Sequence, residues 1–523
     1  MPSSMQAQAP ATANPFAAAH AHFDRIVGRL SSTEMLTATH ADLEDALHAE
    51  GMTLLRQLYQ DHLDLRAQRE RPREVRGADG ALRAERRQMD RRLMTRFGLV
   101  EVSRLSYGAP GRGSLRPADA ELNLPVESYS HPLRRLVAET ASTMSFEETV
   151  EAMARTTGAT VAKRQAEEMT QRAARDFDAF YQQRAVVCSS EAAARGEVLV
   201  VTTDGKGVVM RHEDLREATR TAAEVSEHKL QTRLSAGEKR NRKRMATVAS
   251  VYTVAPFVRT PREILSRMQG PHAPEARRPK PEDKRVWASL EKEPKQVIEA
   301  MMEEGERRDP ERRKTWVAVV DGNRSQRDLL QREARRRGVR LVIVLDIVHV
   351  IEYVWGAAWA FFEKGTTEAE AWVGERVLEI LRGRGGQVAG GMRRSATLRG
   401  LDEKQREAVE ACATYLLNNK RRISYDEYLA AGYPIASGVI EGACRHLIAD
   451  RLEITGARWG MTTAEAVLRL RSLRSSGDFN QYWTFHLERE LERNHTTDYT
   501  GGIIPQPAVT AAGSSAIRLV PGR

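Results

Sequence analysis

Two aspartates each end an apolar run and precede a glycine. Asp204 ends the run VLVVTTD and is followed by Gly205. Asp321 ends the run WVAVVD and is followed by Gly322. A carboxylate at the end of a strand, beside a small residue, leaves room for a metal ion and a phosphate group. An Asp-Gly pair after a strand is also an ordinary turn, so the argument depends on both sites repeating one local design.

A third carboxylate, Glu441, lies in the first turn of a helix predicted to begin near Gly438. Ser437 is the expected N-cap of this helix. The apolar residues that follow have helical spacing, and they are Ile440, Cys444, Leu447, Ile448 and Leu452. A first-turn glutamate is often only a favourable partner of the helix dipole. Its function depends on whether the fold brings it to the two aspartates.

Three carboxylates around one point suit the cleavage of a phosphodiester bond. That reaction needs an activated water and a stabilised leaving oxygen, and two metal ions about 3.5–4 Å apart supply both. Mg²⁺ is a hard cation that prefers carboxylate oxygens. Asp204, Asp321 and Glu441 are therefore the candidate catalytic residues and the candidate ligands of two Mg²⁺ ions, for which Mn²⁺ can substitute.

Asp346 is the rival of Asp321 as the second ligand, because it too ends an apolar run, VRLVIVLD. His349 follows three residues later and could position DNA or order the metal site. The alternative for His349 is a histidine packed in the core. We prefer Asp321 because Gly322 follows it.

The elements that must position these residues predict an α/β fold. The order is strand, strand, strand, helix, strand, helix, strand, helix, which indicates a mixed sheet with helices on its faces, as in an RNase H-like fold. The first two strands are expected within 197–210, on either side of a turn. The others are expected as strands at 244–257, 315–323 and 339–346 and helices at 285–308, 325–338 and from 347 onward. The core is divided into a first part at 197–349, a helical insertion at 350–431 and a second part at 432–493.

The chain before this core is expected to be mostly helical and to bind DNA. At 523 residues the chain is long enough for two to four domains. Residues 1–30 are predicted to be disordered, 31–130 to form a helical region with a hairpin near 92–108, and the tail 494–523 to be flexible. The net charge of +10 suits a polyanionic partner, although 71 acidic residues dilute it.

A helix-turn-helix is predicted within 131–190. Ser145 and Glu148 have the spacing of a capping box, Gly158 breaks the helix, and a second helix begins near Val161. Lys163 and Arg164 would then lie at the start of the recognition helix, the part that enters a major groove. The alternative is an ordinary pair of packed helices.

Other basic residues near the carboxylates are candidates for contact with DNA phosphates. The densest run could also be a solvated surface, and Trp459 could stack on a base or simply pack. The candidates are Lys239, Arg240, Arg242, Lys243 and Arg244 in the run, and Arg445, Arg451, Arg458 and Trp459 after Glu441. The three cysteines are too far apart for a disulfide framework or a zinc finger, and no apolar stretch reaches the ~20 residues of a membrane helix.

Several longer motifs resemble the DDE transposases of bacterial insertion sequences, of the ISKra (Kra-four) type, which are related to the Mutator-like transposases. The resemblance covers roughly residues 85–490 and is most specific in the last of the motifs. They are RRLMTRFGLVEVSRLSY, LRPADAELNLP, GEKRNRKRMATVASVYTV, VVDGNRSQ and ASGVIEGACRHLIADRLEITGARWG. LDIVHV also fits a Cys/Asp-x-x-His element that follows the second catalytic Asp in related transposases.

The resemblance implies a two-metal transposase with Asp204, Asp321 and Glu441 as its triad. The expected partners are double-stranded DNA, as terminal inverted repeats and as target, and further copies of the chain in a homodimer or higher oligomer. A cytoplasmic, nucleoid-associated location with no membrane follows. Two alternatives stay open: an RNase H-like nuclease that cuts structured DNA and moves nothing, and a DNA-binding regulator without catalysis.

Overall fold

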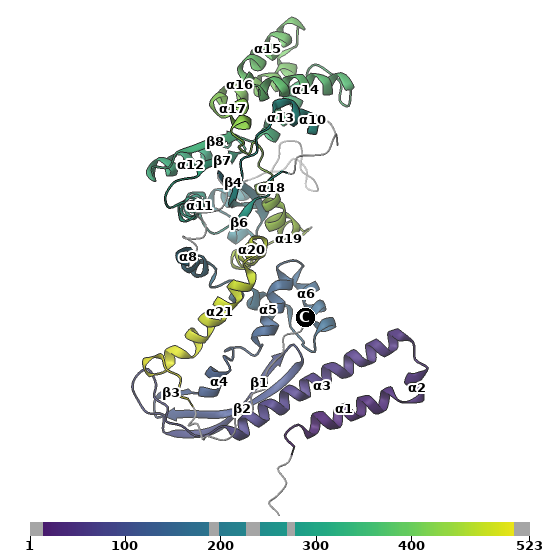
Figure 1. Cartoon of the computed structure of the whole chain (residues 1–523), viewed down its shortest axis with the longest axis vertical. Coiled ribbons are helices and arrows are strands. Elements are labelled where there is room, and N and C mark those ends of the chain that lie inside the picture. Colours follow the sequence, from purple (N-terminus) through teal and green to yellow (C-terminus); the bar gives the residue numbers. More distant parts are fainter. Residues whose placement is uncertain (1–13, 188–197, 226–240, 269–277, 455, 507–523) are drawn as a thin grey trace, which may run out of the picture. The chain divides into compact units, whose positions relative to one another are not determined.

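The computed structural model describes residues 14–187, 198–225, 241–268, 278–454 and 456–506 (Figure 1). The protein is a mixed α/β protein whose chain divides into two compact units. Unit 1 comprises the residues up to Ala173 and those from Trp483 onward, and unit 2 comprises Ala174–Tyr482. Among the described helices, none combines the length and the apolar character needed to cross a membrane.

Unit 1 begins with a helical arm, α1 (Ala17–Leu30), α2 (Thr33–Leu36) and α3 (His40–Arg69). The prediction of disorder over 1–30 is wrong for the stretch of α1, because Ile26 and Ala19 are buried there and Asp61 on α3 accepts a hydrogen bond from the Ala19 backbone N–H at 3.1 Å. Residues 1–13 lie outside the described residues.

A three-stranded antiparallel sheet follows the arm, formed by β1 (Glu85–Thr95), β2 (Gly98–Ala109) and β3 (Arg112–Leu115). The predicted hairpin is therefore confirmed, and β1 is longer than expected. The α3 helix packs on β2, and a small core joins them, formed by Leu63, Leu93, Val100, Val102 and Leu124.

Four more helices complete the N-terminal part of unit 1: α4 (Pro117–Glu121), α5 (His131–Ala141), α6 (Phe146–Thr156) and α7 (Lys163–Ala173). The capping box of Ser145 and Glu148 at the start of α6 is confirmed. The second helix of the predicted pair begins at Lys163, two residues after the expected Val161. Gly158 separates the two helices, and its backbone N–H donates to the Arg96 carbonyl at 3.0 Å.

The last described segment of the chain also belongs to unit 1. Helix α21 (Phe479–Asn494) carries the chain there from unit 2, and short turns at Thr496–Asp498 and Thr500–Gly502 follow. Tyr499 is only 3% exposed, and its backbone forms a bridge with Gly77. The expectation of a flexible tail from 494 is therefore wrong up to residue 506, because a buried aromatic side chain fixes it.

Unit 2 is built on a five-stranded mixed sheet of order β6-β5-β4-β7-β8. Strands β4, β5 and β6 are antiparallel neighbours, whereas β7 and β8 run parallel to β4. Helices separate the strands from β6 onward, since a parallel crossover requires a long connection. The strands are β4 (Val198–Val209), β5 (Lys243–Val254), β6 (Glu282–Ser289), β7 (Thr315–Val320) and β8 (Leu341–Leu345).

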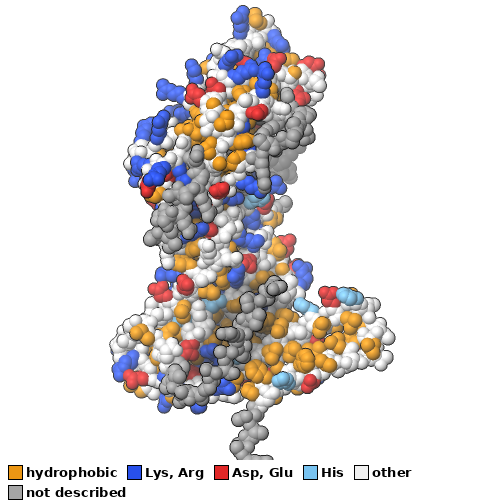
Figure 2. Space-filling model, viewed as in Figure 1, with side chains coloured by type: hydrophobic (Ala, Val, Ile, Leu, Met, Phe, Trp, Pro, Cys, Tyr) orange, Lys and Arg blue, Asp and Glu red, His pale blue; other side chains and the backbone are white. Residues whose placement is uncertain are grey.

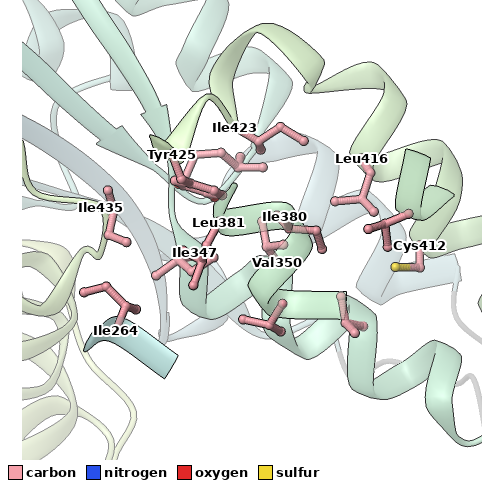
Figure 3. Packing of buried hydrophobic residues seen from close by; sticks show 14 of the residues in the cluster. Ile264, Ile347, Val350, Ile380, Leu381, Cys412, Leu416, Ile423, Tyr425 and Ile435 are labelled. Carbon is pink, nitrogen blue, oxygen red and sulfur yellow. The ribbon is translucent and has the colours of Figure 1, made fainter. Parts of the chain in front are cut away.

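Helices cover the sheet and form the block between β8 and Glu441. The predicted insertion at 350–431 consists mainly of helices. It shares one core with the sheet, because Val200 of β4, Val319 of β7 and Leu345 of β8 belong to the same buried cluster. Figure 3 shows Ile380, Leu416 and Tyr425 of the insertion in this core. The elements are α8 (Phe177–Val187), a turn at His212–Asp214, α9 (Glu217–Val225), α10 (Pro261–Met268), α11 (Pro294–Arg308), α12 (Arg324–Arg336), α13 (Ile347–Ala358), α14 (Thr367–Leu381), α15 (Gly385–Leu398), α16 (Glu403–Asn418), a turn at Lys420–Arg422, α17 (Tyr425–Ala430), α18 (Gly438–Ala443), a π-helix at Cys444–Ala449, α19 (Asp450–Leu452) and α20 (Met461–Ser476).

Two strand assignments from the sequence are wrong, and helices α9 and α10 interrupt the expected run of three strands. The alternation of strands and helices from β7 onward is confirmed. The expected strand-turn-strand at 197–210 is one continuous strand, β4, because β5 pairs with it along its whole length. The start of the expected helix at 285–308 is strand β6, and the helix begins only at Pro294, where Glu293 and Gln296 form a capping box. Residues 269–277 and 226–240 lie outside the described residues.

Gly158 offers a test of unit 1. A Cβ added there would lie 2.5 Å from the Phe97 carbonyl oxygen, which is backbone and cannot rotate away. We expect Gly158→Ala to lower the free energy of unfolding by about 1–3 kcal/mol, measured by urea denaturation. The control is Gly28→Ala in α1, where an added Cβ meets no atom within 4 Å and the helix should gain about 0.5–1 kcal/mol. Equal effects of the two substitutions would contradict the proposed constraint.

Candidate functional site

The three aspartates lie at one level of the sheet, with Asp204 in β4 and Asp321 and Asp346 directly after the parallel strands β7 and β8. The parallel registers pair Thr202 with Val319 and Val320 with Leu345. Continued past these pairs, the same registers align Asp204 with Asp321 and Asp321 with Asp346. The Asp346 N–H donates to the Val320 carbonyl at 2.8 Å, which extends the pairing of β7 and β8 by one residue.

Asp204 lies inside β4, just beyond the stretch paired with β7, and not at the end of a strand as predicted. Its Oδ1 accepts the Gly205 N–H at 2.6 Å, and its Oδ2 lies 3.2 Å from the Sγ of Cys444. Burial, together with the negative charge of Asp204, raises the pKa of the Cys444 thiol well above its usual range. The thiol therefore stays protonated and donates to the carboxylate.

Glu441 is exposed and lies in the first turn of α18, as predicted. Ser437 occupies the N-cap position, but its hydroxyl makes no capping bond. It donates instead to the Oδ2 of Asp346 and lies 3.3 Å from the Oε1 of Glu441. Ser437 thereby connects the end of β8 with the helix that carries Glu441.

The helix of Glu441 continues as a π-helix over Cys444–Ala449. Such segments are rare and frequently occur at functional sites. Arg471 of α20 is buried and donates through Nε to the Leu447 carbonyl at 2.9 Å and through Nη2 to the His446 carbonyl. An arginine more than twenty residues away thus holds the irregular turn, and no local pattern in the sequence signals this role.

His349 lies beside the aspartates in the first turn of α13 and is partly exposed, so it is not the core histidine of the alternative interpretation. Burial alone would lower its pKa, but a hydrogen bond with Glu352 and the charges of Asp346 and Asp321 outweigh that effect and raise the pKa. The Nδ1 of His349 lies 2.9 Å from Glu352 Oε2. The imidazolium therefore persists to higher pH than in a free histidine and offsets part of the acidic charge.

Asp321 is partly buried and directly precedes Gly322, whose φ of +96° favours glycine. The hydroxyl of Tyr415 donates to the Asp321 carbonyl at 3.0 Å, and a Cβ on Gly322 would lie 2.8 Å from that hydroxyl. Gln326, on the next helix, is 9% exposed, and its Oε1 accepts no hydrogen bond from the described residues. Sequence reasoning missed both Tyr415 and Gln326.

The donor set suits a hard cation. Asp346, Glu441 and His349 in its neutral form each offer one ligand atom, and these atoms all lie within 4.8 Å of one another. Asp204 and Asp321 are not members of that close group, although each keeps carboxylate lone pairs that its observed hydrogen bonds do not use. Carboxylate oxygens dominate the five side chains, which fits Mg²⁺ better than a softer metal.

The Asp346 carboxylate accepts more structural hydrogen bonds than the Asp321 carboxylate does. It is fully buried, its Oδ1 accepts the Val348 N–H at 2.8 Å as the N-cap of α13, and its Oδ2 accepts the Ser437 N–H at 3.1 Å. Within the described parts of the chain, the Asp321 carboxylate accepts only the Asn323 N–H, at 2.8 Å. This difference favours Asp321 as the more available carboxylate.

The basic candidates divide into exposed and structural residues. Arg242, Lys243, Arg445 and Arg458 are exposed. The pairs Lys243–Glu453 (3.4 Å) and Arg445–Asp450 (3.6 Å) lie at the surface, where such contacts contribute little. The Nε of Arg244 donates to the Leu290 carbonyl at 2.9 Å, which ties β5 to the loop after β6. Lys239 and Arg240 lie outside the described residues.

Arg451 and Trp459 are buried, which corrects their assignment to the DNA-contacting surface. They are 3% and 6% exposed, and the guanidinium of Arg451 lies 4.7 Å from the centre of the Trp459 ring. The indole N–H donates to the Leu452 carbonyl at 3.1 Å, and the backbone of Trp459 pairs with the end of β4. The aromatic side chain packs, as in the alternative interpretation, and offers no face to a base.

In unit 1, Lys163 and Arg164 are both exposed at the start of α7. Lys163 lies 3.4 Å from Glu147, and Arg164 lies 3.1 Å from Glu168. These surface pairs leave both cations accessible to a competing anion.

Neither a scan against protein families nor a search of curated proteins finds a match for this chain.

The two rival aspartates predict different effects on stability. Asp346→Asn places an amide donor against the N–H and O–H groups that the carboxylate now accepts, so we expect the free energy of unfolding to fall by about 1–3 kcal/mol. Asp321→Asn leaves an oxygen for the Asn323 N–H and should change stability by less than about 0.5 kcal/mol. Urea denaturation of both variants measures the difference. A loss of stability in Asp321→Asn as large as in Asp346→Asn would contradict this assignment.

Proposed function

We propose that this chain is a DNA transposase that cleaves DNA at the ends of an insertion sequence and joins the freed 3′-hydroxyl to target DNA. The alignment of Asp204 with Asp321 on parallel strands carries the proposal. Two hydrogen bonds connect the helix of Glu441 with these aspartates. Cys444 donates to Asp204, and Ser437 donates to Asp346. A set of acidic residues so arranged suits metal-dependent cleavage of a phosphodiester bond.

The topology of unit 2 supports an RNase H-like core within this proposal. Three antiparallel strands come first in the chain, and two further strands add in parallel beside β4. The sequence predicts β7 and β8 with their helices in this arrangement, whereas it places the segment of β6 in a helix. The helical block lies between the second aspartate and Glu441, as the resemblance to the ISKra-type transposases implies.

Asp204, Asp321 and Glu441 would hold the metal ions. At such a site two Mg²⁺ ions supply activation of the attacking water and stabilisation of the leaving oxygen. Cys444 orients the Asp204 carboxylate, and Ser437 orients Glu441 and Asp346. The raised pKa of His349 keeps a positive charge beside Asp321 and Asp346, which reduces the repulsion among the carboxylates.

Helices α6 and α7 are the proposed recognition pair for the terminal inverted repeats. The exposed Lys163 and Arg164 at the start of α7 lie where residues of a recognition helix contact DNA. The exposed Arg242, Lys243, Arg445 and Arg458 belong to unit 2 and are proposed to contact phosphates there. Cleavage at two element ends implies at least two copies in the DNA complex.

The first test replaces each member of the triad. We expect Asp204→Asn, Asp321→Asn and Glu441→Gln each to lower the rate of Mg²⁺-dependent cleavage at a terminal inverted repeat by about 100-fold or more, because each removes a metal-binding carboxylate. Chelation by EDTA should stop cleavage in the wild type, and Mg²⁺ or Mn²⁺ should restore it. Gel-shift assays should show unchanged DNA binding in the variants.

The matched control for this test is Glu370→Gln, at an exposed glutamate in the first turn of α14. It should retain most of the cleavage activity. Cleavage retained by all three triad variants would overturn the mechanism. Strand transfer of a pre-cut end would distinguish a transposase from a nuclease. If the wild type shows no metal-dependent cleavage, a DNA-binding regulator without catalysis would be favoured.

A second test concerns recognition. We expect Lys163→Ala with Arg164→Ala to weaken binding to the inverted repeat and to reduce the salt dependence of binding by about one unit for each phosphate that the variant no longer neutralises. Lys404→Ala, an exposed lysine on α16, serves as the control. Fluorescence anisotropy over a range of salt concentrations measures both effects. Unchanged affinity in the double variant would exclude this face of α7 from DNA binding.

A further inference from the structure

The helical arm of unit 1 has apolar side chains on two sides, and the described residues cover only one of them. Between the helices, Ala19, Ile26 and Met35 are buried. On α3, Leu63 is buried against the sheet in the core that includes Val100. Two helices that form a single layer can bury one shared side but not the faces that both of them turn outward.

The uncovered side carries large apolar residues from both helices. Phe23 and Val27 on α1 are 54% and 45% exposed, and Leu47, Leu55 and Leu58 on α3 are 50%, 44% and 39% exposed. Residues spaced by three, four or multiples of these lie on one helix face, so each set forms a stripe. Figure 2 shows hydrophobic side chains gathered along this arm. We call these five residues the arm face.

Gly51 lies within the stripe on α3, four residues after Leu47 and four before Leu55. Glycine in the middle of a helix costs about 0.5–1 kcal/mol relative to alanine. A Cβ at Gly51 would meet no atom within 4 Å, so nothing described in this chain requires the small residue. A glycine flanked by exposed leucines suits the close approach of a second helix.

The distribution of charge along α3 determines in which orientation a second α3 helix could pack against it. Residues 40–50 carry four acidic side chains (Asp42, Glu44, Asp45 and Glu50) and no Lys or Arg, whereas residues 52–69 carry Arg56, Arg66 and Arg69 against two aspartates. A second α3 running parallel would place the acidic halves together. An antiparallel α3 that crosses at Gly51 places Asp42, Glu44 and Asp45 opposite the uncharged residues 57–60, so only that orientation avoids repulsion between the acidic halves.

We propose that the arm face is a dimer interface, occupied by the arm of a second copy of this chain. The two α3 helices run antiparallel and cross at Gly51, and Phe23 and Val27 of each copy pack on the other arm. Two helical hairpins then form a four-helix bundle, in which each hairpin covers the apolar side of the other. The interface is isologous, with the same residues on both copies. It forms without DNA and without metal, so it is independent of the proposed catalysis.

The test measures the mass of the full chain in solution, without DNA, by sedimentation equilibrium. The wild type should be a dimer at micromolar concentration. Leu47→Glu with Leu55→Glu should raise the dimer dissociation constant by at least about 100-fold, because four charges would be buried in each dimer. The control is Leu398→Glu, at a leucine of α15 that is 76% exposed, which should leave the dimer intact.

A second variant distinguishes the loss of a dimer contact from misfolding of the single chain. Gly51→Met replaces glycine by a good helix former with open space around it, so the single chain should keep or gain thermal stability. The same side chain should weaken the dimer at least about 10-fold if the helices cross there. A monomeric wild type at about 50 µM (roughly −6 kcal/mol), or a dimer unaffected by both variants, would overturn the proposal.

Discussion

The hydrogen bond from Ser437 to the buried carboxylate of Asp346 is the contact on which the candidate site depends. The aspartates and Glu441 come from stretches separated by the whole helical block between α13 and α17. Packing of that block alone would place the Glu441 helix only approximately. The same carboxylate caps α13 and accepts two donors from Ser437, so one buried group sets the ends of two helices relative to β8. Its burial makes it costly to disturb, since an unpaired buried charge is strongly destabilising.

The acidic character of the site creates a second constraint, because like charges repel where their sheet edge places them together. The chain offsets this repulsion with neutral donors and one cation. The Cys444 thiol, whose pKa is raised by burial and by Asp204, donates without carrying charge. Ser437 likewise donates its hydroxyl and its backbone N–H to Asp346 without carrying charge. His349 adds a positive charge that its acidic neighbours stabilise. A divalent cation would neutralise the acidic charge that remains.

Sequence patterns predicted the elements well where one signal dominated. The apolar runs before Asp321 and Asp346 are strands β7 and β8, and the first-turn position of Glu441 is confirmed. Patterns failed where a distant partner decided the outcome. The glycines after Asp204 suggested a turn, but pairing with β5 keeps β4 extended through them. Their place after Glu441 makes Trp459 and Arg451 candidates for DNA contact, with packing as the alternative for Trp459, yet both are buried and the backbone of Trp459 pairs with the end of β4. The sequence likewise predicts a flexible segment around Tyr499, but Tyr499 is buried and its backbone pairs with Gly77, which is remote in sequence.

The π-helix after Glu441 shows why such features escape prediction. An α-helix would continue the apolar spacing from Ile440 through Leu447 without interruption, and the local sequence gives no reason for a wider turn. Arg471 supplies the reason from α20, because its guanidinium donates to two carbonyls of that turn, those of His446 and Leu447. The wider turn changes the rotation of the helix directly after Cys444. Glu441 and Cys444 lie close to Asp346 and Asp204, while the π-helix beyond Glu441 packs on α20, so contacts from residues remote in sequence determine the shape of this turn.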